Sequence, residues 1–304
     1  MARMMCRCLY SFTGVAVALA AFAQQPPAPQ LPEGVTVHRG LAYVTKNAHE
    51  RHVLDLYLPA EGDNLPLIIW IHGGGWQNGS KDRPTGLQFL RDGYAIASIN
   101  YRLSSHALFP AQIEDCKAAV RWLRANARKY RTDPKRFGVW GASAGGHLVA
   151  MLGTTGGVKE FDVGENLQVS SRVQAVCDFY GPTDFLQMDA HRVPGATLRH
   201  ESPESPEAKL IGGPIQENPE RVARANPITY IRKDAPPFLI VHGDADPLVP
   251  HHQSELLRDA LEKAGVPVSL YTVKGGGHGQ GFQQDANLMP AVREFFTKTL
   301  KPRP

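Results

Sequence analysis

Apolar and polar positions follow the two periods that distinguish strands from helices. Seven short segments, apolar throughout or alternating apolar with polar, predict strands. They span 52–58, 67–72, 94–100, 136–141, 173–180, 238–242 and 268–273. The sequence LIIWIH at 67–72 is apolar throughout, which is typical of a central parallel strand buried on both faces. HVLDLYL at 52–58 alternates instead, which indicates a half-buried strand.

Between these strands, apolar residues recur at three- and four-residue intervals that place them on one face of a helix. The clearest series is Ile113, Cys116, Val120, Leu123 and Ala127. Further helices are predicted over 147–152, 252–264 and 285–300. Strands that alternate with helices predict an α/β domain with a mainly parallel sheet. In such a sheet, sites form at the carboxyl ends of the strands.

The segment 181–232 breaks this rhythm. It is rich in proline and charge and has weak periodicity, so we interpret it as a cap or lid inserted after a strand. The domain that carries this insertion is expected to cover residues 36–301. Before it, the Pro- and Gln-rich sequence at 24–34 predicts an extended, exposed lead-in over residues 24–35.

Residues 1–23 have the pattern of a secretory signal peptide. Arg3 and Arg7 precede an apolar stretch, and Ala21-Phe22-Ala23 matches the small-x-small cleavage pattern. The apolar stretch is shorter than the roughly 20 residues that a membrane-spanning helix needs. We therefore expect cleavage after Ala23, no stable membrane anchor, and a secreted or periplasmic protein.

Composition narrows the class of protein. The chain has 304 residues, of which 42% are apolar, and a formal charge of +4 without a basic cluster, so nucleic acid is not an expected partner. Two of its four cysteines, Cys6 and Cys8, belong to the predicted signal peptide. Cys116 and Cys177 lie among apolar neighbours, which favours buried free thiols. Pairing of these two in an oxidising compartment is the alternative.

The sequence GVWGASAGGHLV at 138–149 places a serine between a predicted strand and a predicted helix. Gly141-Ala142-Ser143-Ala144-Gly145 fits the G-x-S-x-G pattern of a nucleophile on a sharp strand-to-helix turn. Small neighbours relieve the crowding of that turn, and the helix N-terminus favours negative charge beside the hydroxyl. A small-residue helix cap without chemistry is the alternative.

A serine hydroxyl needs a base, and an acid to orient that base. The strand at 238–242 runs into GDADPLVP, and the strand at 268–273 runs into a Gly-rich loop that holds His278. The order Ser143, Asp246, His278 matches the order that G-x-S-x-G enzymes use. Asp244 is expected to shape its own turn, and Asp184 is an alternative acid.

The remaining histidines suggest structure more than chemistry. His72, His147 and His242 lie at positions that are usually structural. The sequence contains no H-E-x-x-H and no paired Cys-x-x-Cys, so no metal site is expected.

The sequence IHGGGWQNGSKD at 71–82 follows the central strand. Consecutive glycines let backbone N–H groups converge on one point, as an oxyanion hole requires. We assign the hole to the N–H groups of Gly74 and Gly75, with that of Ala144 from the turn after the nucleophile. A phosphate-binding loop is the alternative, but it would place Lys-Ser/Thr directly after the glycines, where Trp76 stands.

With these motifs, the chain resembles an α/β-hydrolase esterase over roughly residues 36–300. The similar segments are IHGGGW, the run from NYRLSSHALFP to GVWGASAGGHLVAML, and PPFLIVHGDADPLVP with GGGHG. They resemble the bacterial feruloyl-esterase-like and acetyl-xylan-esterase-like branch, near the hormone-sensitive-lipase relatives. This resemblance implies ester hydrolysis through an acyl-enzyme, no cofactor, and a cap over the acyl pocket.

We therefore expect a serine carboxylesterase that acts on aromatic-acid (feruloyl) or acetyl esters of plant polysaccharide. Aromatic polyesters are a second substrate class with a similar acyl group. Trp76, Tyr180 and Phe185 are candidates for an aromatic acyl pocket, with ordinary packing as the alternative. Two other classes compete: a small serine peptidase of the prolyl-oligopeptidase type, and a non-catalytic binding module on a hydrolase scaffold.

Overall fold

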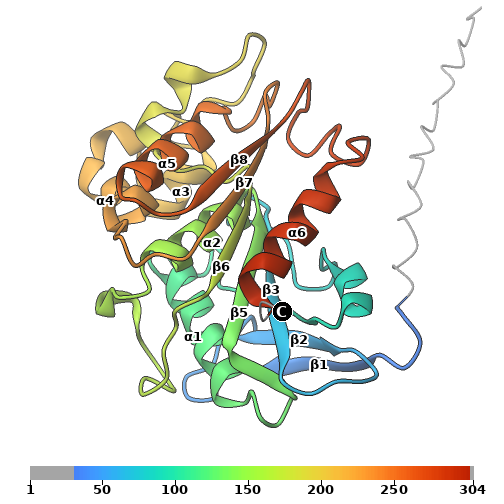
Figure 1. The fold of residues 1–304 in the computed structure, drawn as a ribbon. Helices are drawn as coiled ribbons and strands as arrows, with labels where there is room; N and C mark the ends of the chain where they lie inside the picture. The colour runs from blue at the N-terminus through green and yellow to red at the C-terminus, as the bar shows by residue number, and fades with distance from the viewer. Residues whose placement is uncertain (1–30, 302–304) are drawn as a thin grey trace, which may run out of the picture. The chain divides into compact units, whose positions relative to one another are not determined.

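A single eight-stranded sheet organises the part of the chain that is described, residues 31–301 of a computed structural model (Figure 1). The predicted signal peptide and most of the predicted lead-in lie outside these residues. In spatial order the strands are β1, β2, β4, β3, β5, β6, β7 and β8. Their bounds are Thr36–Ala42 (β1), Val53–Leu58 (β2), Leu65–Ile71 (β3), Ala95–Ile99 (β4), Thr132–Ala142 (β5), Ala175–Phe179 (β6), Phe238–Gly243 (β7) and Val268–Val273 (β8).

Strand direction divides the sheet into an antiparallel edge and a parallel remainder. β2 pairs antiparallel with both β1 and β4, whereas β4, β3, β5, β6, β7 and β8 pair parallel in turn. All seven predicted strands are present, and the mainly parallel sheet is confirmed. The sequence did not predict β1, because this edge strand is largely solvent-exposed and carries little apolar patterning.

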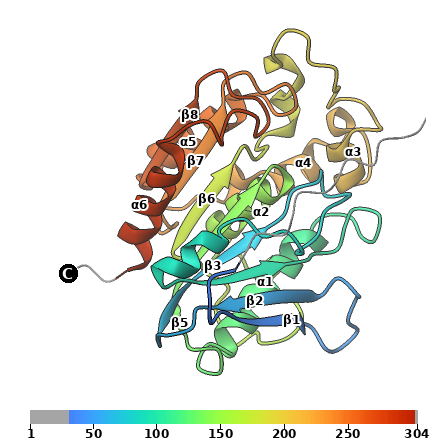
Figure 2. The ribbon, with the colours of Figure 1, turned by 90° about the vertical axis from the view of Figure 1, so that its right-hand side faces the viewer.

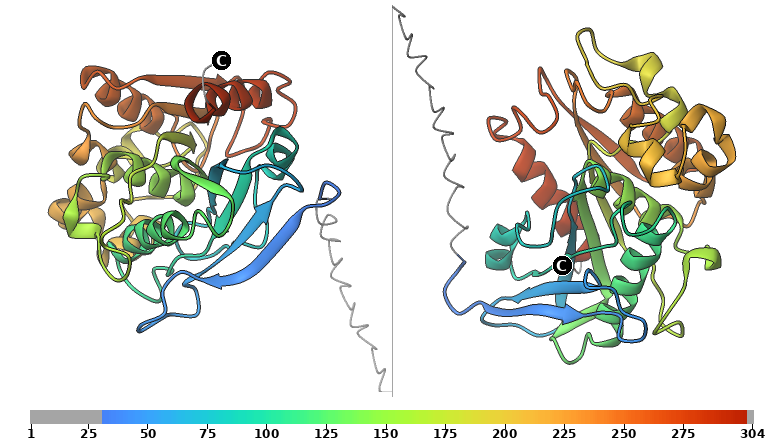
Figure 3. Two further views of the ribbon diagram at one scale, coloured as in Figure 1. Left: turned by 60° about the horizontal axis from the view of Figure 1, so that its bottom comes forward. Right: turned by 180° about the vertical axis from the view of Figure 1, so that it is seen from behind.

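Helices cover both faces of the sheet (Figures 1 and 3). On one face lie α1 (Ala111–Ala125), α2 (Ala144–Thr154) and α5 (His252–Lys263). On the other lie α6 (Leu288–Leu300) and the 3-10 helix η1 (Leu87–Asp92). Because helices bury both faces, β3 can be apolar throughout and is buried along its whole length.

The segment expected to form a cap connects β6 to β7 and lies to one side of the helical layer (Figure 2). It contains α3 (Pro206–Ile211), α4 (Pro219–Ala225) and the 3-10 helices η3 (Phe185–Gln187), η4 (Asp189–His191), η5 (Ile215–Glu217) and η6 (Pro227–Tyr230). A further 3-10 helix, η2 (Lys159–Phe161), follows α2. His147 in α2 anchors the segment, because its Nε2 lies 2.7 Å from the carbonyl oxygen of Ala225.

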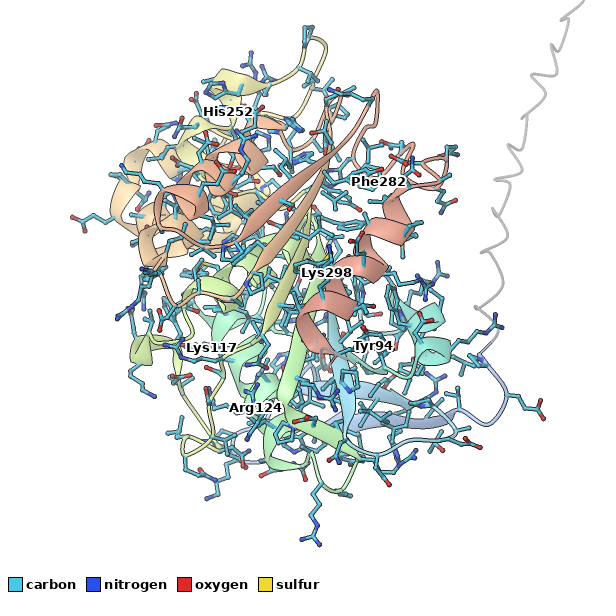
Figure 4. The ribbon with its side chains drawn as sticks, in the orientation of Figure 1. Tyr94, Lys117, Arg124, His252, Phe282 and Lys298 are labelled. Atoms are coloured by element: carbon cyan, nitrogen blue, oxygen red, sulfur yellow. The ribbon has the colours of Figure 1, made fainter. Side chains whose placement is uncertain are left out.

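A buried charge cluster fixes α1 against the loop after α2. Lys117 and Arg121 are at most 1% exposed, and Figure 4 labels Lys117 on α1. Both bind the carboxylate of Asp162, with Lys117 Nζ at 3.2 Å and Arg121 Nη1 at 3.1 Å. Their remaining donors bind backbone carbonyls of the same loop, such as that of Thr155. These cations are thus compensated inside the protein, which burial requires.

The two cysteines outside the predicted signal peptide are free and buried, as the favoured interpretation of the sequence held. Burial raises the pKa of both thiols, Cys116 and Cys177, well above the usual value. Within residues 31–301, no helix is long and apolar enough to cross a membrane.

Candidate active site

Ser143 stands on the turn between β5 and α2 with a backbone φ of +57°. A positive φ is strained for a residue with a side chain, and such strain is common where a catalytic group must be held out from the backbone. The flanking glycines are needed because the backbone is crowded. A Cβ on Gly141 would collide with the carbonyl of Gly145, and one on Gly145 would collide with that of Ile71 in β3.

Asp246 and His278 meet beyond the carboxyl ends of β7 and β8. His278 Nδ1 lies 2.7 Å from Asp246 Oδ2. The other oxygen of Asp246 accepts hydrogen bonds from the N–H groups of Leu248 at 2.8 Å and Val249 at 3.0 Å. Burial alone would raise the pKa of Asp246, but hydrogen bonds from His242, His278 and Val249 hold it well below the usual value. The carboxylate is therefore ionised and oriented toward His278.

His242, which was expected to be structural, is a further partner of Asp246. Its Nε2 lies 3.3 Å from Asp246 Oδ2 and 3.0 Å from the carbonyl oxygen of Val249. Both neighbours are acceptors, so Nε2 carries the proton, while Nδ1 lies 2.6 Å from the hydroxyl of Ser254. His242 is fully buried, and it contacts the carboxylate oxygen that the backbone partners do not.

The two rival acids have other partners. Asp244 Oδ1 accepts a hydrogen bond from the N–H of Gly275 at 2.6 Å, so it ties the β7 loop to the loop after β8 instead of shaping its own turn. Asp184 caps η3 by accepting from the N–H of Leu186. The carboxylate bound to His278 is that of Asp246 alone among the described residues.

Backbone geometry favours an oxyanion hole in the glycine loop. Gly74 and Gly75 have φ values of +108° and +58°, a conformation that residues with side chains rarely adopt. Within residues 31–301, the N–H groups of both glycines lack a hydrogen-bond acceptor. The N–H of Ala144, in the first turn of α2, also lacks one, as is usual at a helix start.

Three side chains, those of His72, Arg51 and Tyr101, support the glycine loop through hydrogen bonds and ring stacking. His72 Nδ1 lies 2.8 Å from the carbonyl oxygen of Gly73, and its Nε2 faces Arg51 at 3.2 Å. Arg51 also donates to the carbonyl of Gly79, and the ring of Tyr101 stacks on that of His72. Burial lowers the pKa of His72 to about 4, so this ring is neutral at pH 7 and can accept from Arg51.

Six residues have expected chemical roles, and all of them except Asp246 line one cavity of about 550 Å³. Its wall includes Ser143, His278, Gly74, Gly75 and Ala144. Asp246 lies behind His278 and is 1% exposed. The volume is within the usual range for small-molecule sites, roughly 300–1,000 Å³.

Two of the three expected aromatic residues reach this cavity. Tyr180 lines it and packs on His278, with ring centroids 4.5 Å apart. Phe282, labelled in Figure 4, also packs on Tyr180, with ring centroids 5.3 Å apart. Trp76 lines the cavity but is only 1% exposed. Phe185 does not line it and packs behind Trp76, which corrects the position expected from the sequence.

Several cavity residues were not singled out from the sequence. The cap contributes Pro182, Leu198, His200, Pro206 and Glu207, while Gln77, Asn78, Leu248 and Val249 come from the neighbouring loops. Gln77 and Asn78 could have been found from the sequence, because they follow the glycine motif closely. No motif marks the cap residues. Among the described residues, no group of three or more His, Cys, Asp or Glu is arranged to hold a metal ion.

Comparison with known proteins identifies the family. A family model described as BD-FAE matches residues 54–261. Esterase LipQ of Mycobacterium tuberculosis is 31% identical over 72% of this chain, which spans 51% of that relative. The chain therefore belongs to the BD-FAE family of α/β-hydrolase esterases. It spans about half the length of the curated relatives it matches.

Solved structures extend this comparison. A truncated carbohydrate esterase from gut microbiota has a TM-score of 0.79 and 39% identity, covering 86% of this chain and 95% of that one. An acetyl ester-xyloside bifunctional hydrolase from Caldicellulosiruptor lactoaceticus has a TM-score of 0.64 and 28% identity, covering 81% and 85%. Both likenesses include most of each chain, so the expected α/β-hydrolase fold is confirmed.

Proposed function

We propose that this protein is a serine carboxylesterase that removes acetyl or feruloyl groups from plant polysaccharide or its fragments. The observation that carries the proposal is the 2.7 Å contact between Asp246 and His278, at the wall of a cavity that also holds Ser143. The N–H groups of Gly74 and Gly75 support the same reaction, because they have no acceptor among residues 31–301 and are available to an oxyanion.

The reaction proceeds in two halves. Ser143 Oγ attacks the ester carbonyl carbon while His278 Nε2 takes the hydroxyl proton. When the tetrahedral intermediate collapses, the ester C–O bond breaks and His278 returns that proton to the leaving alcohol. Water then attacks the acyl-enzyme with His278 as base, which releases the acid and restores Ser143. Asp246 stabilises the imidazolium in both halves.

The oxyanion that forms in each half needs hydrogen-bond donors. Gly74, Gly75 and Ala144 supply backbone N–H groups whose positions are fixed before substrate binds. Losing one such donor typically lowers kcat about 100- to 1,000-fold.

Support for a carbohydrate alcohol comes from the similar structures, of which one is a carbohydrate esterase and another an acetyl ester-xyloside hydrolase. Support for an acyl group larger than acetyl comes from the cavity volume and from Tyr180 in its wall. Aromatic polyesters share the aromatic acyl group of ferulate and belong in the same substrate panel.

The test is hydrolysis of p-nitrophenyl acetate, methyl ferulate and acetylated xylan by the wild type and by Ser143→Ala. Ser269→Ala is the matched control, because Ser269 is an exposed serine of β8 outside the cavity. We expect Ser143→Ala alone to lose activity. Equal activity of the two variants would refute the assignment, and cleavage of peptide p-nitroanilides instead of esters would favour a peptidase.

We also propose that the protein is exported and that its signal peptide is cleaved after Ala23. The support is the arrangement of Arg3, Arg7 and the small-x-small triplet in the sequence. Sequencing the amino terminus of the protein recovered from its host would give Gln24 first. An intact Met1 would contradict this proposal.

A further inference from the structure

Two ionisable side chains of the cap lie in the wall of the catalytic cavity, and the proposed chemistry uses neither. His200 and Glu207 are 1% and 3% exposed, and both line the cavity with Ser143. His200 Nδ1 lies 3.1 Å from Glu207 Oε2. Charged residues are rarely buried without a purpose that offsets their desolvation.

The hydrogen bonding of this pair is incomplete. Both ring nitrogens of His200 and the Oε2 atom of Glu207 are buried without a hydrogen-bond partner in the described part of the chain. The Nδ1–Oε2 distance suits an ion pair, but the two groups are not aligned for a hydrogen bond. Unsatisfied buried polar groups are costly, and a ligand in the adjacent cavity can offset this cost by supplying the missing partners.

The backbone holds both residues in place. Asp189 accepts a hydrogen bond from the N–H of His200 at 3.1 Å and one from Glu201 at 3.0 Å. On the other side, the Ser205 hydroxyl caps the turn that carries Glu207. The pair is therefore positioned before any ligand arrives, which reduces the entropy lost on binding.

The charges suit a hydroxyl-bearing ligand. Burial alone would lower the pKa of His200, but the neighbouring carboxylates of Glu207 and Asp189 raise it above the usual value. The raised pKa favours the imidazolium form of the ring, which only donates, beside a carboxylate that only accepts. A hydroxyl group can accept from one and donate to the other, and neighbouring sugar hydroxyls can engage both.

The pair also lies near the loop that carries the catalytic acid. Leu248 and Val249 line the same cavity and follow Asp246, the residue that orients His278. The carbonyl of Leu248 contributes to the raised pKa of His200, which places the imidazole beside this loop. Because His278 returns the proton to the leaving alcohol, the alcohol portion of the ester is expected on this side of the cavity.

We propose that His200 and Glu207 form the subsite that binds sugar hydroxyls of the leaving alcohol and so select carbohydrate esters. The proposal rests on the proposed esterase function and names the class of alcohol that it takes. The same pair could bind the phenolic hydroxyl of a feruloyl group, and the test below separates these sources.

The test compares two substrates with the same acyl group, the monoacetate of methyl β-xyloside and p-nitrophenyl acetate. In Glu207→Gln, the ratio of their kcat/KM values should fall about 10- to 100-fold, because a hydrogen bond to a charged group is lost. Most of this should appear as a higher KM for the xyloside. Glu204→Gln is the control, because Glu204 lies three residues earlier with an 81% exposed side chain, and it should keep the wild-type ratio.

An unchanged ratio in Glu207→Gln would overturn the proposal and leave the pair a purely structural role in the cap. A fall in the ratio of methyl ferulate to methyl acetate, without one for the xyloside, would assign the pair to the acyl group and also overturn it. If Glu207→Gln does not fold, His200→Gln tests the same pair and should show the same fall.

Binding separates failure of the subsite from failure of the esterase function. Calorimetry on Ser143→Ala with xylotriose should detect binding, and adding Glu207→Gln should weaken it about 10-fold or more. This result requires no hydrolysis. Equal binding by both proteins, or no binding by either, would overturn the subsite even if p-nitrophenyl acetate is hydrolysed.

Discussion

Replacing Asp246 with asparagine tests the proposed catalytic chemistry most directly, because every hydrogen bond to this side chain is known. One carboxylate oxygen accepts from Leu248 and Val249, and the other faces His278 at 2.7 Å and His242 at 3.3 Å. All four partners are N–H donors. An asparagine side chain can offer its oxygen to only one of these two pairs, and it must place its NH₂ group against the other.

The consequence depends little on which orientation the amide adopts. With NH₂ toward His278, the imidazole must take the tautomer that accepts at Nδ1 and carries its proton on Nε2. It then cannot take the proton of Ser143. With NH₂ toward Leu248 and Val249, two hydrogen bonds of 2.8 and 3.0 Å are lost instead and the loop shifts. The equivalent change in a serine protease lowers kcat about 10⁴-fold, which corresponds to about 5 kcal/mol.

The assay is steady-state hydrolysis of p-nitrophenyl acetate at pH 7, with thermal unfolding to verify the fold. Asp244→Asn is a matched control two residues away, because its oxygen can still accept from the N–H of Gly275. We expect it to stay within about threefold of wild type, since its side chain is 32% exposed and substitutions near the surface usually have small effects. An Asp246→Asn variant with more than a tenth of wild-type activity, or an equally large loss in Asp244→Asn, would refute the reasoning.

Three further predictions concern stability and reactivity. Asp162→Asn should lower the free energy of unfolding by about 3–5 kcal/mol, because it leaves the buried cations of α1 without their carboxylate; a urea midpoint within error of wild type would contradict this. His147 is buried and its pKa is lowered to about 4, so stability should fall as pH drops from about 6.5 to 4, on the order of 3 kcal/mol. In His147→Gln this slope in chemical denaturation should be smaller, and an identical slope would exclude His147 as its source. Cys116 and Cys177 should resist iodoacetamide in the native protein and react only after unfolding, which mass spectrometry would show; labelling at a rate independent of denaturant would count against their burial.

The parts of the fold that follow from periodicity were predictable from the sequence. The apolar run of β3 predicted a strand, and apolar residues at three- and four-residue intervals predicted helix α1. Edge strand β1 did not, because an exposed strand needs few apolar residues. Lys117 lies within the predicted amphipathic helix but is buried, since its partner Asp162 is distant in sequence. Pairing across such a separation leaves no local pattern.

Some residues of the candidate site were likewise predictable from the sequence and others were not. Ser143, Asp246 and His278 lie in the loops that follow strands. The sequence alone assigned them to one edge of the sheet, where the cavity and the 2.7 Å contact lie. The contact of His242 with the acid was not predicted, because it depends on how the loop folds back. His200 and Glu207 could not have been found, since the cap has no periodicity from which to place its side chains.

The position of the cap between two neighbouring strands has a consequence for how this enzyme family can diversify. β6 and β7 are adjacent, so the excursion from residue 180 to 237 begins and ends at points one strand spacing apart, about 4.8 Å. Lengthening a loop between fixed ends adds only about 0.6 kcal/mol for each doubling. The nucleophile precedes this excursion, and the acid and base follow it. New cap sequences can therefore be exchanged as units, altering which alcohol is accepted while the strands that carry the chemistry keep their register.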